Sequence, residues 1–174
     1  MKADIPSLLR EEMIALEPEL VLPPMPEPPA PTEHYPWQCK EAALRVLVDI
    51  MCRSDEVRNP TKLFKDLIFR EKCTSTGIGE GIAIPHVRTM QPRGLVMGFV
   101  RFSQGIEFCS VDDEPVFFMF GIVTPPYEDR LYFEVLKWVG RMFGECTWLR
   151  DALLAARTPA EVRGIFLGLA RGNM

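Results

Sequence analysis

The chain has 174 residues, of which 47% are hydrophobic and 25% are charged, and its formal net charge is −4 at pH 7. This length and composition suit one globular domain with a hydrophobic core. The acidic balance and the lack of clustered Lys and Arg exclude a surface built to coat a nucleic-acid backbone. No uncharged apolar stretch reaches the roughly 18 residues of a membrane span, and residues 1–20 lack the apolar centre of a signal peptide.

The cysteines indicate the compartment. There are five of them, an odd number, widely spaced and without a CxxC pair. Such spacing argues against a zinc ribbon or a thioredoxin-like redox pair, and it is typical of buried thiols in a reducing environment. We therefore expect a cytoplasmic protein without a metal or other cofactor.

The first 36 residues read as an N-terminal segment that ends in a proline-rich arm. The stretch of residues 7–16 has the composition of either a short helix or a strand, and the pattern does not choose between them. Residues 22–36 are dense in proline, which removes backbone donors and favours an extended polyproline II conformation. This arm is interpreted as a semi-rigid linker, with a docking ligand for a partner as the alternative; His34 lies in it and is expected to be solvated.

Residues 37–174 are expected to form the main domain. Apolar residues at helical spacing predict helices over residues 38–55, 59–72, 129–143, 148–157 and 158–170. Asn59 with Pro60 and Thr158 with Pro159 are typical of helix N-termini. Short apolar runs predict strands over residues 81–84, 95–102 and 115–123, the last apolar throughout and therefore central. Helices before and after a group of strands indicate an α/β domain with a mixed β-sheet flanked by helices.

The stretch "TSTGIGEGIAIPHVR", residues 74–88, is the candidate functional motif. Gly77, Gly79 and Gly81 permit positive φ and close backbone approach, so successive N–H groups could converge on an anion. The spacing is neither that of the Rossmann nor that of the Walker motif, and nucleotide binding is therefore not indicated. Glycines by themselves are a weak signal, and the residue that follows them carries the chemistry.

That residue is His86, whose direction of exit from the sheet is fixed by Pro85. A histidine is largely uncharged near neutral pH, since its ordinary pKa is about 6.5. With one ring nitrogen donating to a carbonyl, the other could accept a phosphoryl group. The candidates for charge neutralisation are the glycine-loop N–H groups, the hydroxyls of Ser75 and Thr76, and a guanidinium from Arg70 or Arg88.

Other roles for His86 stay open on these grounds. A histidine after a short strand is commonly a structural residue. Cys73 could serve as a nucleophile with His86 as its base, although no orienting partner is evident. A metal site is not favoured, because His34 is the only other histidine.

The longer stretch "FREKCTSTGIGEGIAIPHVR" resembles the signature of the IIA component of the bacterial phosphoenolpyruvate-dependent phosphotransferase system, in its fructose/mannitol and nitrogen-regulatory branch. The segments "KEAALRVLVDIM", "VDDEPVFFMFGIVTPP" and "LRDALLAARTPAEVRGIF" extend the likeness to residues 38–170. The resemblance implies a phosphotransferase with the phosphotransferase IIA / anion-transporter cytoplasmic-domain-like fold. It implies that His86 is the phosphoryl acceptor, that Arg70 steadies the phosphoryl group, and that Thr76 and the glycine loop line the pocket.

The resemblance also implies partners. Proteins of this family take the phosphoryl group from a histidine-containing phosphocarrier protein and pass it to a IIB component, or use it as a signal toward a regulated target protein. Neither branch is excluded by the sequence. The alternative is a non-enzymatic binding module, because the same fold resembles the cytoplasmic domain of anion exchangers.

Three features depart from the family pattern. Tyr132 stands where many members carry a second histidine, and a tyrosine can still hydrogen-bond a phosphate oxygen. Val87 replaces a smaller residue and narrows the mouth of the expected pocket. The proline-rich arm resembles an insertion between the first strand and the first helix of the family.

Overall fold

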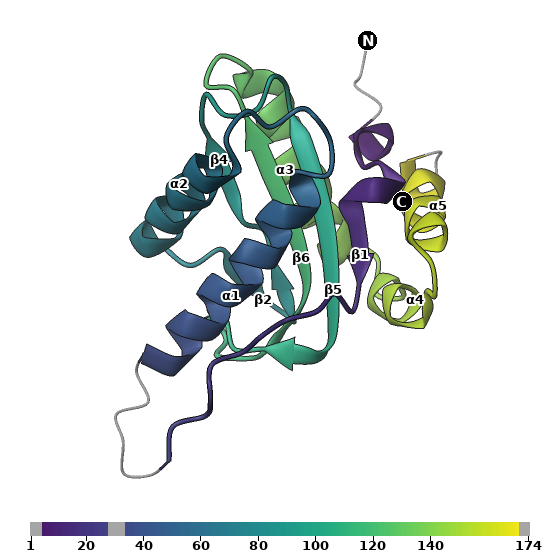
Figure 1. Ribbon diagram of the computed structural model, residues 1–174. Coiled ribbons are helices and arrows are strands. Elements are labelled where there is room, and N and C mark those ends of the chain that lie inside the picture. The colour runs from purple at the N-terminus through teal and green to yellow at the C-terminus, as the bar shows by residue number, and fades with distance from the viewer. Residues whose placement is uncertain (1–4, 28–33, 171–174) are drawn as a thin grey trace.

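A six-stranded mixed sheet forms the centre of the protein. The computed structural model describes residues 5–27 and 34–170, and Figure 1 shows the strands between layers of helices. The strands are β1 (Ile14–Leu16), β2 (Gly77–Gly79), β3 (Ile82–Ala83), β4 (His86–Arg88), β5 (Val96–Ile106) and β6 (Val116–Thr124). Their order is β1-β5-β6-β3-β2, and β4 also pairs with β6.

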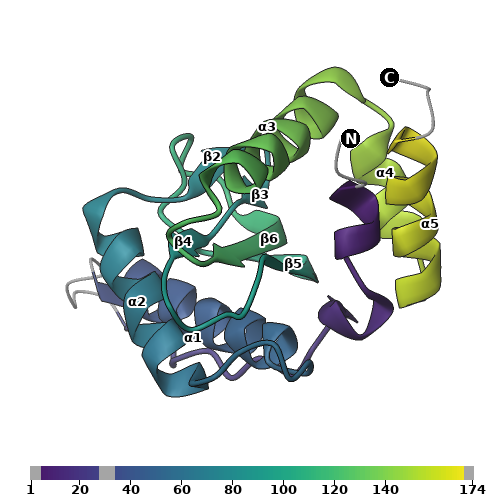
Figure 2. The ribbon, with the colours of Figure 1, turned by 90° about the horizontal axis from the view of Figure 1, so that it is seen from above.

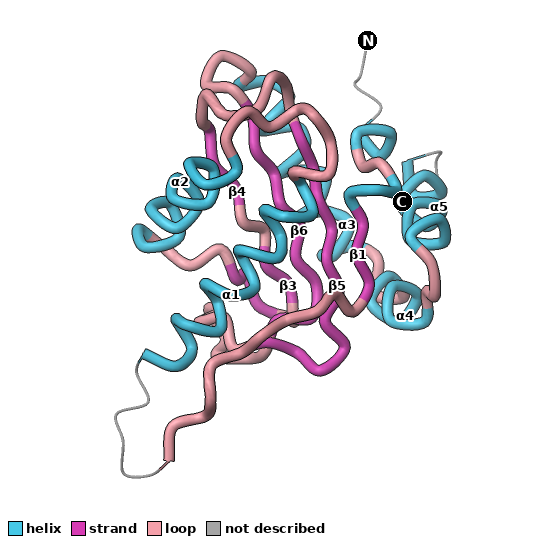
Figure 3. Tube along the Cα trace, in the orientation of Figure 1, coloured by secondary structure: helices cyan, strands magenta, loops and turns pink. Residues whose placement is uncertain are grey.

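The directions of the strands make the sheet mixed. The long central strands β5 and β6 run antiparallel, while β1 runs parallel to β5 and both β3 and β4 run parallel to β6. Strand β3 returns antiparallel to β2 after a tight turn in which Glu80 and Gly81 have φ of 55° and 77°. Figure 3 shows how these short strands lie beside the long central pair.

Helices cover the sheet in three groups. On one face lie α1 (His34–Met51) and α2 (Pro60–Cys73), and on the opposite face lies α3 (Asp129–Glu145), as the view in Figure 2 shows. Beyond the β1 edge, α4 (Leu149–Ala155) and α5 (Pro159–Ala170) pack with two 3₁₀ turns, Ile5–Leu8 and Glu11–Met13. The fold class expected from the sequence is thus confirmed. Within the described ranges, no helix has both the length and the apolar character that a bilayer crossing demands.

Two glycines let α1 approach the sheet closely. Gly98 of β5 and Gly121 of β6 are paired across the two strands. A Cβ at Gly121 would lie 2.7 Å from Met51 Sδ and 3.0 Å from Leu47 Cδ1, and a Cβ at Gly98 would lie 2.6 Å from Met51 Cγ. The absence of side chains at these two positions therefore seats α1 directly on the centre of the sheet, where Leu47 and Met51 are fully buried.

The helix boundaries follow the predicted signals closely at α2. Asn59 is its N-cap and accepts a hydrogen bond from the Lys62 N–H at 2.9 Å, and Pro60 occupies the first helical position. At α5, Thr158 accepts from the Glu161 N–H at 3.2 Å, while the Glu161 carboxylate reaches the Arg157 N–H at 2.7 Å. The caps predicted for both helices are present.

The N-terminal part of the chain differs from the expectation in two respects. The open choice for residues 7–16 resolves into 3₁₀ turns followed by β1, which joins the sheet beside β5. The helix α1 begins at His34, earlier than predicted. Pro36 does not prevent this, because the N–H groups of a first helical turn have no partner within the helix and a proline there therefore breaks no hydrogen bond. His34 is exposed, as expected. Residues 22–27 have no regular structure, and residues 28–33 of the arm lie outside the described residues.

Candidate functional site

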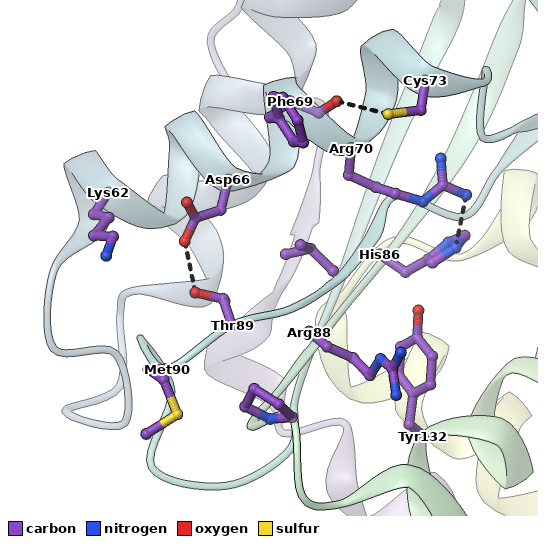
Figure 4. A pocket seen from close by; sticks show the side chains of 12 residues that line it. Lys62, Asp66, Phe69, Arg70, Cys73, His86, Arg88, Thr89, Met90 and Tyr132 are labelled. Carbon is purple, nitrogen blue, oxygen red and sulfur yellow. Dashed lines mark hydrogen bonds between the residues drawn. The ribbon is translucent and has the colours of Figure 1, made fainter.

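A pocket of about 630 Å³ lies where the end of α2, strand β4 and the start of α3 meet. Figure 4 shows the side chains that line it. They come from segments far apart in the sequence and are Lys62, Asp66, Phe69, Arg70, Cys73, His86, Val87, Arg88, Thr89, Met90, Pro126 and Tyr132. The structure therefore brings together six of the residues singled out in the sequence, which are Arg70, Cys73, His86, Val87, Arg88 and Tyr132.

The position of His86 is set by a break in the edge of the sheet. Strands β3 and β4 lie along the same side of β6, and Ile84 and Pro85 separate them. The Pro85 carbonyl still accepts from the Ile122 N–H at 2.9 Å, so the chain continues beside β6 and enters β4 at His86. The imidazole is half-buried and borders the pocket.

The two ring nitrogens of His86 have different partners. Nδ1 lies 2.6 Å from the Ile84 carbonyl oxygen, which can only accept a hydrogen bond. Nε2 lies 3.0 Å from Nη2 of Arg70, and a guanidinium can only donate. Both contacts are satisfied together by one form of the ring, the neutral tautomer with its proton on Nδ1 and a lone pair on Nε2.

Arg70 is held at both ends of its guanidinium. Its Nη1 donates to the Thr74 carbonyl at 3.0 Å, and its Nη2 donates to His86 Nε2. The first contact ties the side chain back to the end of its own helix α2. The second contact places a positive charge beside the free lone pair of the imidazole, as Figure 4 shows.

Tyr132 and Arg88 form the wall opposite Arg70. The ring centroids of Tyr132 and His86 are 6.0 Å apart, and the phenol hydroxyl points toward the space between His86 and Arg70. The Arg88 guanidinium lies 5.8 Å from the centroid of the Tyr132 ring and donates to the Asp129 carboxylate. The pocket is thus bordered by two guanidinium groups, a phenol and an imidazole, a set that favours an anion.

The pKa values of the two rings reflect this setting. Burial lowers the pKa of His86 below its ordinary value, and the Arg70 charge lowers it further, whereas the Ile84 hydrogen bond and the Glu71 carboxylate act in the opposite direction. Burial also raises the pKa of Tyr132, although the charges of Arg70 and Arg88 offset part of that effect. Near neutral pH the pocket therefore holds an uncharged, nucleophilic imidazole and an uncharged phenol that can donate a hydrogen bond.

The glycine loop lies elsewhere. Of the residues predicted for the phosphate pocket, Ser75, Thr76, Gly77 and Gly79 are not among those that line it in the described chain. They form the start of the β2–β3 hairpin, where a Cβ at Gly77 would lie 2.5 Å from Ser110 Oγ and one at Gly79 would lie 3.0 Å from Asp112 Oδ2. In this structure the glycines serve close packing of the hairpin against the loop that precedes β6.

The hydroxyls of the neighbouring residues are also turned inward. Thr76 is buried, and its Oγ1 donates to Glu71 Oε2 at 2.7 Å. Ser75 Oγ accepts from Lys40 Nζ at 2.9 Å. The contacts with Glu71 and Lys40 determine where the two hydroxyls point, and no local sequence pattern predicts such contacts.

Cys73 lines the pocket but is not arranged as a nucleophile with a base. Its Sγ donates to the Phe69 carbonyl, one helical turn earlier, at 3.4 Å. The ring nitrogens of His86 are engaged by Ile84 and Arg70 instead. The geometry therefore does not support the thiol nucleophile, with His86 as its base, that the sequence left open.

Several participants could not be found from the sequence. The carbonyls of Thr74 and Ile84 belong to the backbone, so no residue type in the sequence indicates their role. The prediction that a carbonyl holds one nitrogen of His86 nevertheless matches the geometry. Lys62, one helical turn before Asp66, lines the outer part of the pocket. The buried Lys40 and Glu71 were not singled out, because a lysine among apolar helix residues is ordinarily interpreted as a solvated one.

Known proteins resemble this chain over most of its length. The fructose-specific EIIA component of a phosphotransferase system from Haloferax volcanii is 28% identical over 162 residues, which cover 93% of this chain and 94% of that protein. The crystal structure of the nitrogen regulatory protein IIA-Ntr from Neisseria meningitidis superposes with a TM-score of 0.76 at 25% identity, covering 93% of this chain and 98% of that one.

A third similarity concerns the fold alone. The mannitol enzyme IIA of Escherichia coli, in its complex with phosphorylated mannitol enzyme IIB, superposes with a TM-score of 0.64 at 19% identity over 90% of this chain and 95% of that one. The resemblance found in the sequence is confirmed by a family match. Residues 35–168 match the family described as phosphoenolpyruvate-dependent sugar phosphotransferase system, EIIA 2, and the protein therefore belongs to this IIA family of fructose, mannitol and nitrogen-regulatory type.

Proposed function

We propose that the protein is a cytoplasmic phosphocarrier whose His86 accepts a phosphoryl group on Nε2. The donor is the phosphohistidine of a histidine-containing phosphocarrier protein. The phosphoryl group then passes to a IIB component, or its presence on His86 regulates a target protein. The observation that carries the proposal is the pair of contacts made by His86, Nδ1 to the Ile84 carbonyl and Nε2 to Arg70, at the border of a pocket lined by guanidinium groups.

The transfer is balanced without a further reactant. The N–P bond of the donor histidine breaks while a bond forms between phosphorus and His86 Nε2, and the proton stays on Nδ1, which keeps donating to the Ile84 carbonyl. Phosphoryl transfer through a loose transition state requires positioning and charge neutralisation rather than covalent help. Arg70 supplies both, since its Nη2 leaves the Nε2 lone pair and donates to a phosphoryl oxygen while Nη1 keeps its bond to Thr74.

Tyr132 and Arg88 complete the proposed phosphate site from the other side. The Tyr132 hydroxyl points toward the space beside Nε2, where it can donate to a second phosphoryl oxygen. Arg88 shares its charge with Asp129, so its contribution is weaker than that of Arg70. In the proposal, the glycine loop and the hydroxyls of Ser75 and Thr76 contribute only through packing, because these residues do not line the pocket.

Both the sugar and the regulatory branch are compatible with the proposed chemistry. The fructose-specific relative and the mannitol protein bound to enzyme IIB support onward transfer to a IIB component. The similarity to a nitrogen regulatory protein supports a regulatory role. The two branches share the first step, and a test of that step applies to either.

The test is phosphorylation with labelled phosphoenolpyruvate, the first enzyme of the system and the histidine-containing phosphocarrier. We expect an acid-labile label on the wild type and none on His86→Gln. The matched control is His34→Gln, since His34 is the other histidine and is exposed in the first turn of α1; it should take up label as the wild type does.

The opposite result is equally informative. If the wild type stays unlabelled with a donor that labels an authentic IIA protein, the phosphocarrier proposal fails. The non-enzymatic binding module is then the remaining function for this fold. Label that survives in His86→Gln would place the acceptor on another residue.

A further inference from the structure

The residues behind the pocket include a buried ion pair that the proposed phosphoryl transfer does not use directly. Lys40 of α1 and Glu71 of α2 are 1% and 3% exposed, and Lys40 Nζ lies 2.8 Å from Glu71 Oε1. Removing two charges from water is costly, and an apolar pair of similar size would often stabilise a fold as well. The hydrogen bonds that the pair makes to other groups therefore indicate what it does.

Those hydrogen bonds converge on two consecutive residues. Lys40 Nζ donates to Ser75 Oγ at 2.9 Å. Glu71 Oε1 accepts from the Thr76 N–H at 2.7 Å, and Glu71 Oε2 accepts from Thr76 Oγ1 at 2.7 Å. Within residues 5–27 and 34–170, the side-chain hydrogen bonds from this pair to a third residue all go to Ser75 or Thr76.

The segment that is fixed in this way also holds Arg70. Thr74 directly precedes Ser75, and its carbonyl accepts from Arg70 Nη1 at 3.0 Å, while Arg70 Nη2 reaches His86 Nε2 at 3.0 Å. A shift of residues 74–76 would move the carbonyl that aims the guanidinium. The Lys40 ammonium is fixed in turn by the face of the Phe108 ring, 4.5 Å from its centroid.

We propose that Lys40 and Glu71 are positioning residues for phosphoryl transfer: the buried pair clamps residues 74–76 so that the Thr74 carbonyl aims Arg70 at Nε2 of His86. This inference rests on the proposed function. The pair does not touch the phosphoryl group and acts only through Arg70. Its role is distinct from that of a core ion pair, whose loss would change stability but not the rate of transfer in the folded protein.

The first test is the initial rate of His86 phosphorylation in Lys40→Met, measured at a temperature where circular dichroism shows the fold intact. We expect a loss of about tenfold relative to wild type, within the range of coupling seen for residues in one hydrogen-bond network. Arg101→Met is the matched control. It removes a second buried cation, which is bonded to Glu17 and to carbonyls of α4, away from the pocket, and should leave the rate within about twofold.

A double-mutant cycle separates positioning from general damage. If Lys40 acts through Arg70, Lys40→Met should slow transfer in the wild type but change it by less than about twofold when Arg70→Ala is already present. Equal losses in both backgrounds would overturn the inference, because they would show an effect that bypasses Arg70.

A second variant covers the case in which Lys40→Met fails to fold because Glu71 is left buried without a counter-charge. Lys40→Met/Glu71→Leu leaves no buried charge at this place yet removes the hydrogen bonds that the two charged side chains make to Ser75 and Thr76. We expect it to fold and to transfer slowly; a folded double variant with the wild-type rate would overturn the inference. If wild type itself takes no label, the proposed function fails instead, so the two failures are distinguishable.

Discussion

At the scale of single residues, Arg70 and His86 act as one unit, because the guanidinium donates to the same nitrogen that is proposed to accept phosphorus. The resting contact protects the neutral tautomer and keeps the cation within reach of the incoming oxygens. A charge-assisted hydrogen bond of this kind contributes about 1.5–3 kcal/mol. The removal of Arg70 should therefore affect transfer much more than folding.

For Arg70→Ala we expect phosphorylation to be slower by about 10- to 160-fold, which is that free energy expressed as a rate ratio, with the melting temperature little changed. Initial rates of labelling and thermal unfolding measure the two effects. Arg141→Ala, which removes an exposed arginine paired with Glu145 on α3, is the control and should label normally. An unchanged rate in Arg70→Ala would assign charge neutralisation to Arg88.

The lowered pKa of His86 predicts the pH dependence of its reaction. Burial disfavours the imidazolium, so the neutral and nucleophilic form persists to a lower pH than in a model peptide with its pKa of about 6.5. We expect the labelling rate, with phosphorylated donor in excess, to stay level as the pH falls through 6.5 and to decline only below it. An NMR titration of the His86 ring should give the same direction, and a midpoint above 6.5 would contradict it.

The same shift contributes to stability with a defined sign. Between the lowered pKa of the folded state and the ordinary value of the unfolded state, the unfolded chain binds more protons at this site. The contribution of His86 to stability is therefore complete above about pH 6.5 and decreases as the pH falls toward the lowered pKa.

At the scale of elements, α2 carries Arg70 at its C-terminal end and depends on its first turn for its position. Asn59 accepts the Lys62 N–H there, and this cap was evident in the sequence because a polar residue precedes a proline and an apolar periodic run. Of the hairpin that follows α2, strand β3 was predicted within residues 81–84, whereas its three-residue partner β2 was not. Strand β3 forms because β6 provides a partner for it, and β2 forms because β3 pairs with it in turn.

We expect Asn59→Ala to lower the free energy of unfolding by about 1 kcal/mol, as the loss of an N-cap does. Urea unfolding followed by circular dichroism measures the change. Asn59→Asp keeps an acceptor at the N-cap and should stay close to wild type. If Asn59→Ala were as stable as wild type, the cap would be redundant with the anchoring of α2 on the sheet.

At the scale of the whole molecule, Arg101 of β5 connects the sheet edge to the C-terminal helices. Its Nε donates to Glu17, which follows β1, at 2.9 Å. Its Nη1 donates to the carbonyls of Leu153 and Ala156 at the end of α4, at 2.8 and 2.6 Å. One buried side chain thus ties the N-terminal strand, the central sheet and α4 together.

Arg101→Ala should therefore cost at least about 2 kcal/mol of stability, because it leaves buried carbonyls without donors. Arg130→Ala, which breaks an exposed pair with Glu134 one turn away on α3, should change stability by about 0.5 kcal/mol or less. Denaturant midpoints of the two variants provide the comparison. Equal midpoints would show that α4 is held by apolar packing alone.

Local sequence determined much of this protein. Helices α1 to α5 were predicted because capping residues and apolar spacing act within one or two turns, as Asn59 and Thr158 illustrate. The central strands β5 and β6 were predicted from their continuous apolar runs. The motif around His86 was sufficient to identify the family and to indicate the residue proposed to react.

Tertiary structure alone decided how the site is built. The short strand β4 exists only because β6 pairs with it, and that pairing carries His86 to the end of α2. The glycine loop was expected at the phosphate site, yet Gly77 packs against Ser110 and the loop does not line the pocket in the described chain. Lys40 is buried because Glu71 and Ser75 meet it from another helix and a loop. These outcomes depend on contacts between residues distant in sequence, whose energies no local pattern contains.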